Sequence, residues 1–148
     1  MKRVCPILLV FVAGAATAAT GTVTLDSVRA DPNPEHRAKA AVDFAAMAER
    51  DAEIANGYSD NARFTTDITN MVAAMELARD SFTAAGKTPG RQPGSFKTVE
   101  LESHNMLHRL ADLREKLDDD QRTQLDGPII KIQEIHDAWF DGIMGKKK

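Results

Sequence analysis

Hydrophobic residues recur at alternating intervals of four and three in three long segments, which follow Ser59, Ser95 and Asp118. This spacing places one apolar seam along a helix, as in helices that pack lengthwise against their neighbours. The seams comprise Phe64, Ile68, Met71, Met75, Ala78 and Phe82; Val99, Ser103, Met106, Leu110, Leu113 and Leu117; and Leu125, Ile129, Ile132, His136, Trp139 and Ile143. The sequence therefore predicts three helices that each bury one seam.

An earlier segment has a different face, which is built mainly from alanine. At Asn33-Pro34-Glu35 a capping side chain precedes a proline suited to the first helical position and an acid near the positive end of the helix dipole. A helix is predicted from there to about Asn56, with Gly57 as its left-handed terminator. Its stripe of small side chains, with Phe44, Met47 and Ile54 beside it, consists of Ala38, Ala41, Ala45, Ala48, Ala52 and Ala55.

Capping residues and glycines predict where the later helices begin and end. Ser59 is expected to cap the second helix, and Gly86 to end it. Residues 86–95 contain two prolines and three glycines, so we expect a loop there. Ser95 or Thr98 is then expected to cap the third helix.

The last helix has the clearest start signal. Asp118 and Gln121 have the spacing of a capping box, in which each side chain bonds to the backbone of the other residue. Gly127 and Pro128 interrupt the segment that follows, and they predict a kink or a short break there.

These segments predict an all-α fold, an antiparallel four-helix bundle of two helical hairpins. The bundle domain is expected over residues 33–148. The alternative is two hairpins that pack loosely or exchange between subunits, because the alanine stripe buries little area and would leave room for a second chain. A homodimer is therefore kept as an alternative.

The first residues predict an export signal. Lys2 and Arg3 precede a short apolar stretch, and Ala16-Thr17-Ala18 has the small-x-small pattern of a cleavage site. We therefore expect a signal peptide over 1–18, a flexible leader over 19–32, and a periplasmic or secreted protein. The apolar stretch is shorter than the roughly 20 residues that a membrane span requires.

Composition narrows the chemistry that this chain can perform. Its one cysteine, Cys5, lies within the expected signal, so disulfides and thiolate ligands are not expected afterwards. The formal charge of −3 becomes −5 once the two positive charges of Lys2 and Arg3 are removed. An acidic balance without a clustered basic face argues against nucleic acid as a partner.

The sharpest candidate site is a histidine pair. His104 and His108 are four residues apart, which places both imidazoles on one helix face as in two-histidine metal sites. Asp112 and Glu115 follow on the same side, so a carboxylate is expected to complete a site for zinc, copper or nickel. The alternative interpretation is two histidines on an ordinary polar surface.

Two further patterns offer weaker metal chemistry. His136 lies on an apolar seam, where it is either a hydrogen-bonded core residue or an axial haem ligand opposite Met47. Met71, Met75 and Met106 have side chains of the kind that bind copper(I), but at seam positions methionine is an adaptable core residue. No cofactor other than a transition metal is expected.

One short stretch resembles a known signature. Leu117-Asp118-Asp119-Asp120-Gln121-Arg122 is similar to the L-T-x-x-Q motif of small periplasmic helical proteins that act in envelope stress, as chaperones or metal-responsive sensors. Asp118 replaces the threonine, and one copy is present where that family commonly has two. The resemblance implies an envelope-stress or chaperone-like binder.

No nucleophile, base and orienting group can be named together, so the sequence favours binding over catalysis. The expected partner is another protein or unfolded chains, which would contact the alanine face and the region around Phe96, Trp139 and Phe140. The alternative function is transition-metal binding through His104 and His108.

Overall fold

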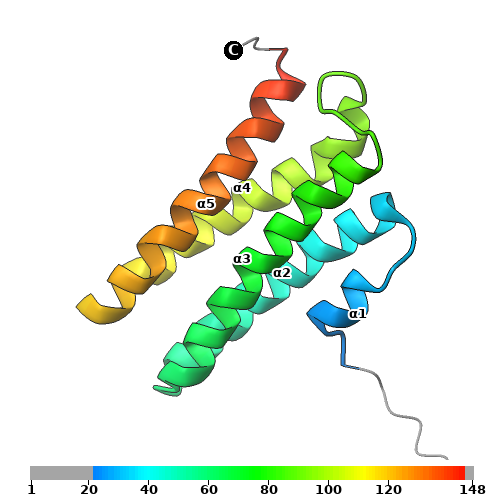
Figure 1. The fold of residues 1–148 in the computed structure, drawn as a ribbon. Coiled ribbons are helices and arrows are strands. Elements are labelled where there is room, and N and C mark those ends of the chain that lie inside the picture. The colour runs from blue at the N-terminus through cyan, green and yellow to red at the C-terminus, as the bar shows by residue number, and fades with distance from the viewer. Residues whose placement is uncertain (1–21, 146–148) are drawn as a thin grey trace, which may run out of the picture.

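The computed structural model describes residues 22–145, and all its regular structure is helical. Five helices follow one another: α1 (Leu25–Arg29), α2 (Pro34–Gly57), α3 (Asn61–Ala84), α4 (Pro93–Glu115) and α5 (Asp119–Ile143). Figure 1 shows α2 with α3, and α4 with α5, as two antiparallel hairpins packed side by side. The predicted all-α bundle of two hairpins is confirmed.

The two hairpins pack so that their first helices, α2 and α4, run parallel to each other, and so do their second helices, α3 and α5. Around the bundle the neighbouring pairs are α2/α3, α3/α5, α5/α4 and α4/α2. Side-chain links between the hairpins rise together along both chains, which requires α2 and α4, and likewise α3 and α5, to run in the same direction. These links are Glu35–Ser95, Glu49–Arg109 and Glu53–Lys116, and Asn61–Gln121, Thr65–Gln124 and Glu76–Lys131.

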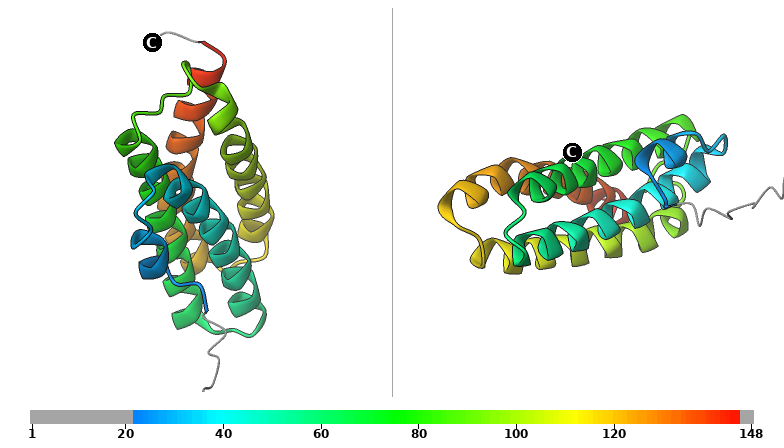
Figure 2. Two further views of the ribbon diagram at one scale, coloured as in Figure 1. Left: turned by 90° about the vertical axis from the view of Figure 1, so that its right-hand side faces the viewer. Right: turned by 90° about the horizontal axis from the view of Figure 1, so that it is seen from below.

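This arrangement explains the long loop between the hairpins. Because α3 and α4 are diagonal partners, residues 85–92 must cross the end of the bundle (Figure 2). Helix axes about 8–10 Å apart give a diagonal of roughly 13 Å. Pro89 packs on Gly142 of α5 during this crossing, so that a Cβ added at Gly142 would lie 2.7 Å from the Cβ of Pro89.

The core consists of the predicted seams. All the seam residues of α3 and of the third predicted helix are buried, and on α5 only Ile129 and Ile143 are partly exposed. All six alanines of the α2 stripe are buried as well, and α2 makes its most extensive contact with α3. Met71, Met75 and Met106 are fully buried, which confirms them as core residues.

The turn between α2 and α3 differs from the prediction. Gly57 is the last residue of α2 and has no left-handed backbone, whereas Ser59 takes that conformation with φ 57°. Asp60, not Ser59, caps α3 by accepting a hydrogen bond from the backbone N–H of Arg63 at 3.0 Å. The left-handed position falls two residues later than expected, and this moves the cap with it.

The start of α4 also differs. The helix begins at Pro93, ahead of both predicted caps, and its N-cap residue Gln92 makes no side-chain capping bond. Proline suits this position because its φ is already helical and because it has no N–H that needs a partner. Ser95 and Thr98 therefore lie within the helix.

The start of α5 follows the prediction. Asp118 accepts from the N–H of Gln121 at 2.8 Å, and the Gln121 side chain accepts from the N–H of Asp118 at 3.4 Å. The helix continues through Pro128 without the expected break. Gly127 helps here, because a residue without Cβ avoids the clash that the proline ring imposes on its predecessor.

Part of the expected leader is helical. Thr24 and Ser27 form a capping box at the start of α1, and Val28 is buried against the bundle. His36 bonds to the Asp31 carboxylate and holds the pKa of that group below its usual value. Arg37 donates to the backbone carbonyl of Asp31 at 2.7 Å. These bonds fasten the segment after α1 to the start of α2.

The expected signal peptide 1–18, with Cys5, lies outside the described residues, as do positions 19–21 of the leader and 146–148. Within residues 22–145 no helix combines the length and the apolar character needed to cross a bilayer.

Candidate metal-binding site

The predicted histidine pair lies on the solvent side of α4. His104 and His108 are both exposed, and their ring centres are 4.7 Å apart in an edge-to-face arrangement. The helix repeat places the two rings one turn apart, as the spacing predicts. Their exposed positions leave both side chains room to change rotamer.

A third histidine joins this pair from α5. The His136 ring centre lies 5.7 Å from that of His104. Together with Gln133, the three histidines line an open hollow of about 440 Å³ between α4 and α5. The His136 side chain is only 9% exposed, so its position is fixed by packing, in contrast to the other two.

The hydrogen bonds of Ser103 determine the tautomer of His136. The Ser103 hydroxyl donates its single proton to the backbone carbonyl of Glu100 at 2.7 Å. Its oxygen lies 3.1 Å from Nδ1 of His136 and must therefore accept a hydrogen bond from Nδ1–H. The carboxylate of Glu100, 3.8 Å from Nδ1, favours the same assignment. In neutral His136 the free lone pair is consequently on Nε2.

An apolar surface continues the row of rings. Phe140 stacks on His136 with ring centres 6.1 Å apart. Leu101, on the neighbouring helix α4, has 56% of its surface exposed. These residues share a second shallow hollow of about 350 Å³ with His104. The groove between α4 and α5 thus combines imidazoles at its centre with apolar side chains at one end.

The predicted carboxylates are not placed with the histidines. Asp112 and Glu115 are exposed, and neither lines the hollow that contains the three rings. In the described part of the chain no group of three or more His, Cys, Asp or Glu side chains is placed so that it could hold a metal ion. A metal ion would therefore require His104 and His108 to turn.

The distances between rings fit such a rearrangement. A metal–nitrogen distance of about 2.0–2.1 Å places the ring centres of histidines on one tetrahedral ion roughly 5 Å apart. The two observed separations of 4.7 and 5.7 Å lie on either side of this value. Because both separations involve His104, the rings of His108 and His136 must also approach each other before all three can ligate one ion.

The structure does not bring together the residues expected to hold haem. Met47 is 37% exposed, and α2 lies diagonally opposite α5. Met47 and His136 therefore do not face each other as two axial ligands of one haem would. His136 is instead the hydrogen-bonded seam histidine of the other interpretation, here with Ser103 as its partner.

Most of the residues that were expected to contact a partner protein are buried, so that expectation is wrong for them. The alanine face, Phe96 and Trp139 are buried inside the bundle. Phe82, Phe96 and Trp139 form an aromatic cluster there, with ring centres 4.4 to 6.2 Å apart. Among the residues named for this role, Phe140 alone keeps substantial exposure, at 39%.

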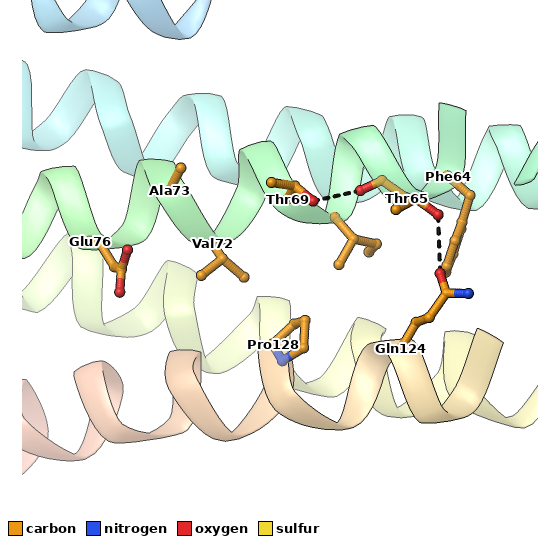
Figure 3. A pocket seen from close by; sticks show the side chains of 9 residues that line it. Phe64, Thr65, Thr69, Val72, Ala73, Glu76, Gln124 and Pro128 are labelled. Carbon is orange, nitrogen blue, oxygen red and sulfur yellow. Dashed lines mark hydrogen bonds between the residues drawn. The ribbon is translucent and has the colours of Figure 1, made fainter. Parts of the chain in front are cut away.

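A larger hollow of about 540 Å³ lies between α3 and α5 (Figure 3). Its walls are mainly apolar, with Val72 and Pro128 facing each other across the gap. The hydroxyls of Thr65 and Thr69 donate to carbonyls of their own helix, and the Thr65 oxygen also lies 3.0 Å from the side-chain amide of Gln124. The hollow between α3 and α5 therefore offers hydrophobic contact, whereas the hollow with the three histidines offers metal ligands.

A charge cluster around the buried Glu49 lies at the border between α2 and α4. The Glu49 side chain accepts a hydrogen bond of 2.6 Å from Arg109, which also donates to Glu102 at 3.0 Å. Oε1 of Glu49 has no hydrogen-bond partner in the described structure. Burial raises the pKa of the Glu49 carboxyl, and the bond from Arg109 offsets part of that rise.

Sequence reasoning missed the contact between Ser103 and His136, although a signal for it existed. Each is the polar residue on an otherwise apolar seam, and the two seams belong to one hairpin. Buried polar groups need partners, so two of them on facing seams are expected to meet. Their level along the hairpin depends on the register of α4 against α5, which the spacing within each helix does not specify.

No protein-family model, curated protein or solved structure matches this chain, so the functional argument depends on the site itself.

Proposed function

We propose that this protein is an exported helical protein that binds a transition-metal ion, with His104 and His108 as its primary ligands. The observation that supports this most is the exposed pair of imidazoles, one helical turn apart, at the hollow between α4 and α5. Neutral imidazole is a good ligand for zinc, copper and nickel. The protein is proposed to act by binding rather than by catalysis.

The test is a calorimetric titration of the purified protein, without a histidine tag, using zinc, nickel and copper(II) chloride. We expect binding of one ion per chain that is lost when His104→Ala and His108→Ala are combined. His36→Ala is the matched control, because His36 is an exposed histidine at the start of α2. Binding that survives the double variant, or that fails in the unchanged protein, would contradict the proposal.

Export is the cellular part of the proposal, and it rests on the first eighteen residues of the sequence. Expression of the full chain in a Gram-negative host tests it through the mass of the protein in the periplasmic fraction. Cleavage after Ala18 is expected. A full-length protein that remains in the cytoplasm would contradict this part alone.

Binding of unfolded chains is the second candidate function, and the apolar end of the groove between α4 and α5 favours it. Leu101 and Phe140 are exposed side by side there, in a surface that unfolded apolar segments can contact. The expected effect is slower aggregation of a heat-unfolded client protein. Leu101→Glu would abolish this effect, whereas Ile130→Glu, on another exposed apolar side chain, would not.

A further inference from the structure

We infer that His136 is the third ligand of the proposed ion, so that the bound metal joins α4 to α5. This inference depends on the proposed function and specifies its ligand set. It replaces the carboxylate that the sequence suggested with a histidine from the neighbouring helix.

The hydrogen of the neutral His136 ring is on Nδ1, which leaves Nε2 free to bind a metal ion. With Nδ1 donating to Ser103, Nε2 has the lone pair that a metal ion needs. Metal-ligating histidines commonly donate their other ring N–H to a carboxylate, carbonyl or similar acceptor, which fixes the tautomer and the ring orientation. His136 has this arrangement, with Ser103 as the acceptor.

The three rings also differ in how far packing restricts them. Packing holds His136 in place, with 9% of its side chain exposed, whereas His104 and His108 lie on the open face of α4. One preplaced ligand and two adaptable ligands reduce the ordering needed on binding, because only exposed rotamers change. His104, which contacts both of the other rings, lies at the centre of the set.

The ligand set also indicates the class of ion. Three neutral imidazoles without a carboxylate or thiolate suit Zn²⁺, Cu²⁺ or Ni²⁺ and are a poor match for Mg²⁺, Ca²⁺ or Mn²⁺. Three protein ligands leave at least one position of a tetrahedral ion for water or another small ligand. The openness of the hollow toward solvent accommodates that position.

Ser103 and Glu100 are positioning residues in this arrangement. They hold His136 through Nδ1 and do not reach the proposed ion. Loss of such an outer partner typically lowers metal affinity by roughly 10–100-fold. We therefore expect Ser103→Ala to weaken binding by about 10-fold.

The experiment compares three variants with the unchanged, tag-free protein in the same zinc, nickel and copper(II) titrations. His136→Gln keeps an amide N–H for Ser103 but removes the imidazole, and we expect it to weaken binding by about 100-fold or more, beyond the usual outer-partner effect. Ser103→Ala is the intermediate case. The combined Asp112→Asn and Glu115→Gln variant should bind like the unchanged protein.

A spectroscopic readout separates positioning from a general structural effect. In the unchanged protein, ¹⁵N chemical shifts of the neutral His136 ring should report the hydrogen on Nδ1, and added Zn²⁺ should shift Nε2. In Ser103→Ala the two tautomers should mix. Circular dichroism checks that each variant keeps its helices.

The outcomes separate the inference from the proposed function. Failure of the unchanged protein to bind any of the three ions overturns both. Binding that His104→Ala with His108→Ala abolishes, but that His136→Gln leaves unchanged, overturns the inference and supports the proposed function. Weakening by the Asp112→Asn and Glu115→Gln variant alone would restore the carboxylate ligand and overturn the role of His136.

Discussion

The two hairpins of this bundle are built on different principles. In α2–α3 one helix contributes a continuous stripe of buried alanines, and its backbone lies close to that of its partner. In α4–α5 the seams have larger side chains and include Ser103 and His136, and open hollows lie between the helices. The comparison shows how packing decides where a site can exist.

Close packing has a physical cost in versatility. Small side chains bring backbones together and leave no volume between them, so a tightly packed pair cannot admit a ligand without movement. The looser pair has volume, polar atoms and solvent access in one place. The proposed metal site accordingly lies on α4–α5, and α2–α3 supports that hairpin.

The largest expected effect comes from adding volume to the tight hairpin. Ala45→Leu inserts three carbons where the residue is completely buried. Overpacking of this kind costs up to about 3 kcal/mol, and we expect that loss in urea-induced unfolding. Ala111→Leu is the control, because it adds the same atoms to an exposed position at the histidine hollow.

For Ala111→Leu we expect a change in stability within about 0.5 kcal/mol, as for surface substitutions in general. The added side chain should instead reduce metal affinity, because it occupies part of the hollow. Equal losses of stability in the two variants would show that the hairpins do not differ in tightness.

A smaller effect is expected where the connecting loop packs on α5. In Gly142→Ala the new Cβ would meet the Cβ of Pro89 at 2.7 Å, so the loop must move. We expect a loss of about 1 kcal/mol despite the better helix propensity of alanine. Gly94→Ala is the control, since no atom lies within 4 Å of its added Cβ, and it should be neutral or slightly stabilising. A stabilised Gly142→Ala variant would mean that the loop moves away freely.

The smallest expected effect is a pH dependence at the border between the hairpins. Burial raises the folded-state pKa of Glu49 above its unfolded value of about 4.5, so the folded protein retains this proton to higher pH than the unfolded chain. The contribution of Glu49 is therefore fully present below pH 4.5 and decreases as the pH rises through the folded pKa.

Relative to Glu49→Gln, the unchanged protein should lose stability over this pH range and then reach a constant difference. Thermal unfolding of both proteins between pH 4 and 8 measures it. A difference that changes in the opposite sense would show that pairing with Arg109 outweighs burial.

The sequence was most informative within single helices and least informative between them. Of the residues on the three four-three seams, all but Ile129 and Ile143 are buried, and the Asp118–Gln121 capping box was correct to the residue. These features depend on neighbours within one or two helical turns. The histidine pair on α4 was found for the same reason, since it lies within one helix.

The errors concern relations between elements. The parallel pairing of the two hairpins, which separates Met47 from His136, depends on how the hairpins dock and leaves no local pattern. The burial of Phe96 has the same origin, whereas Trp139 lies on the seam that the four-three spacing predicts to be buried. The left-handed conformation falls on Ser59 although Gly57 was the expected position. A turn therefore does not always use its glycine to reverse the chain.

The diagonal loop over residues 85–92 also has a consequence for folding. The strongest pairing, α2 with α3, joins residues close in sequence, and α4 with α5 does likewise, so each hairpin can form early at low entropic cost. Docking of one hairpin on the other then completes the native state. Because the docking surfaces are the same whichever chain supplies them, a loop too short to span the diagonal would direct each hairpin to a second molecule, giving an exchanged dimer with unchanged contacts.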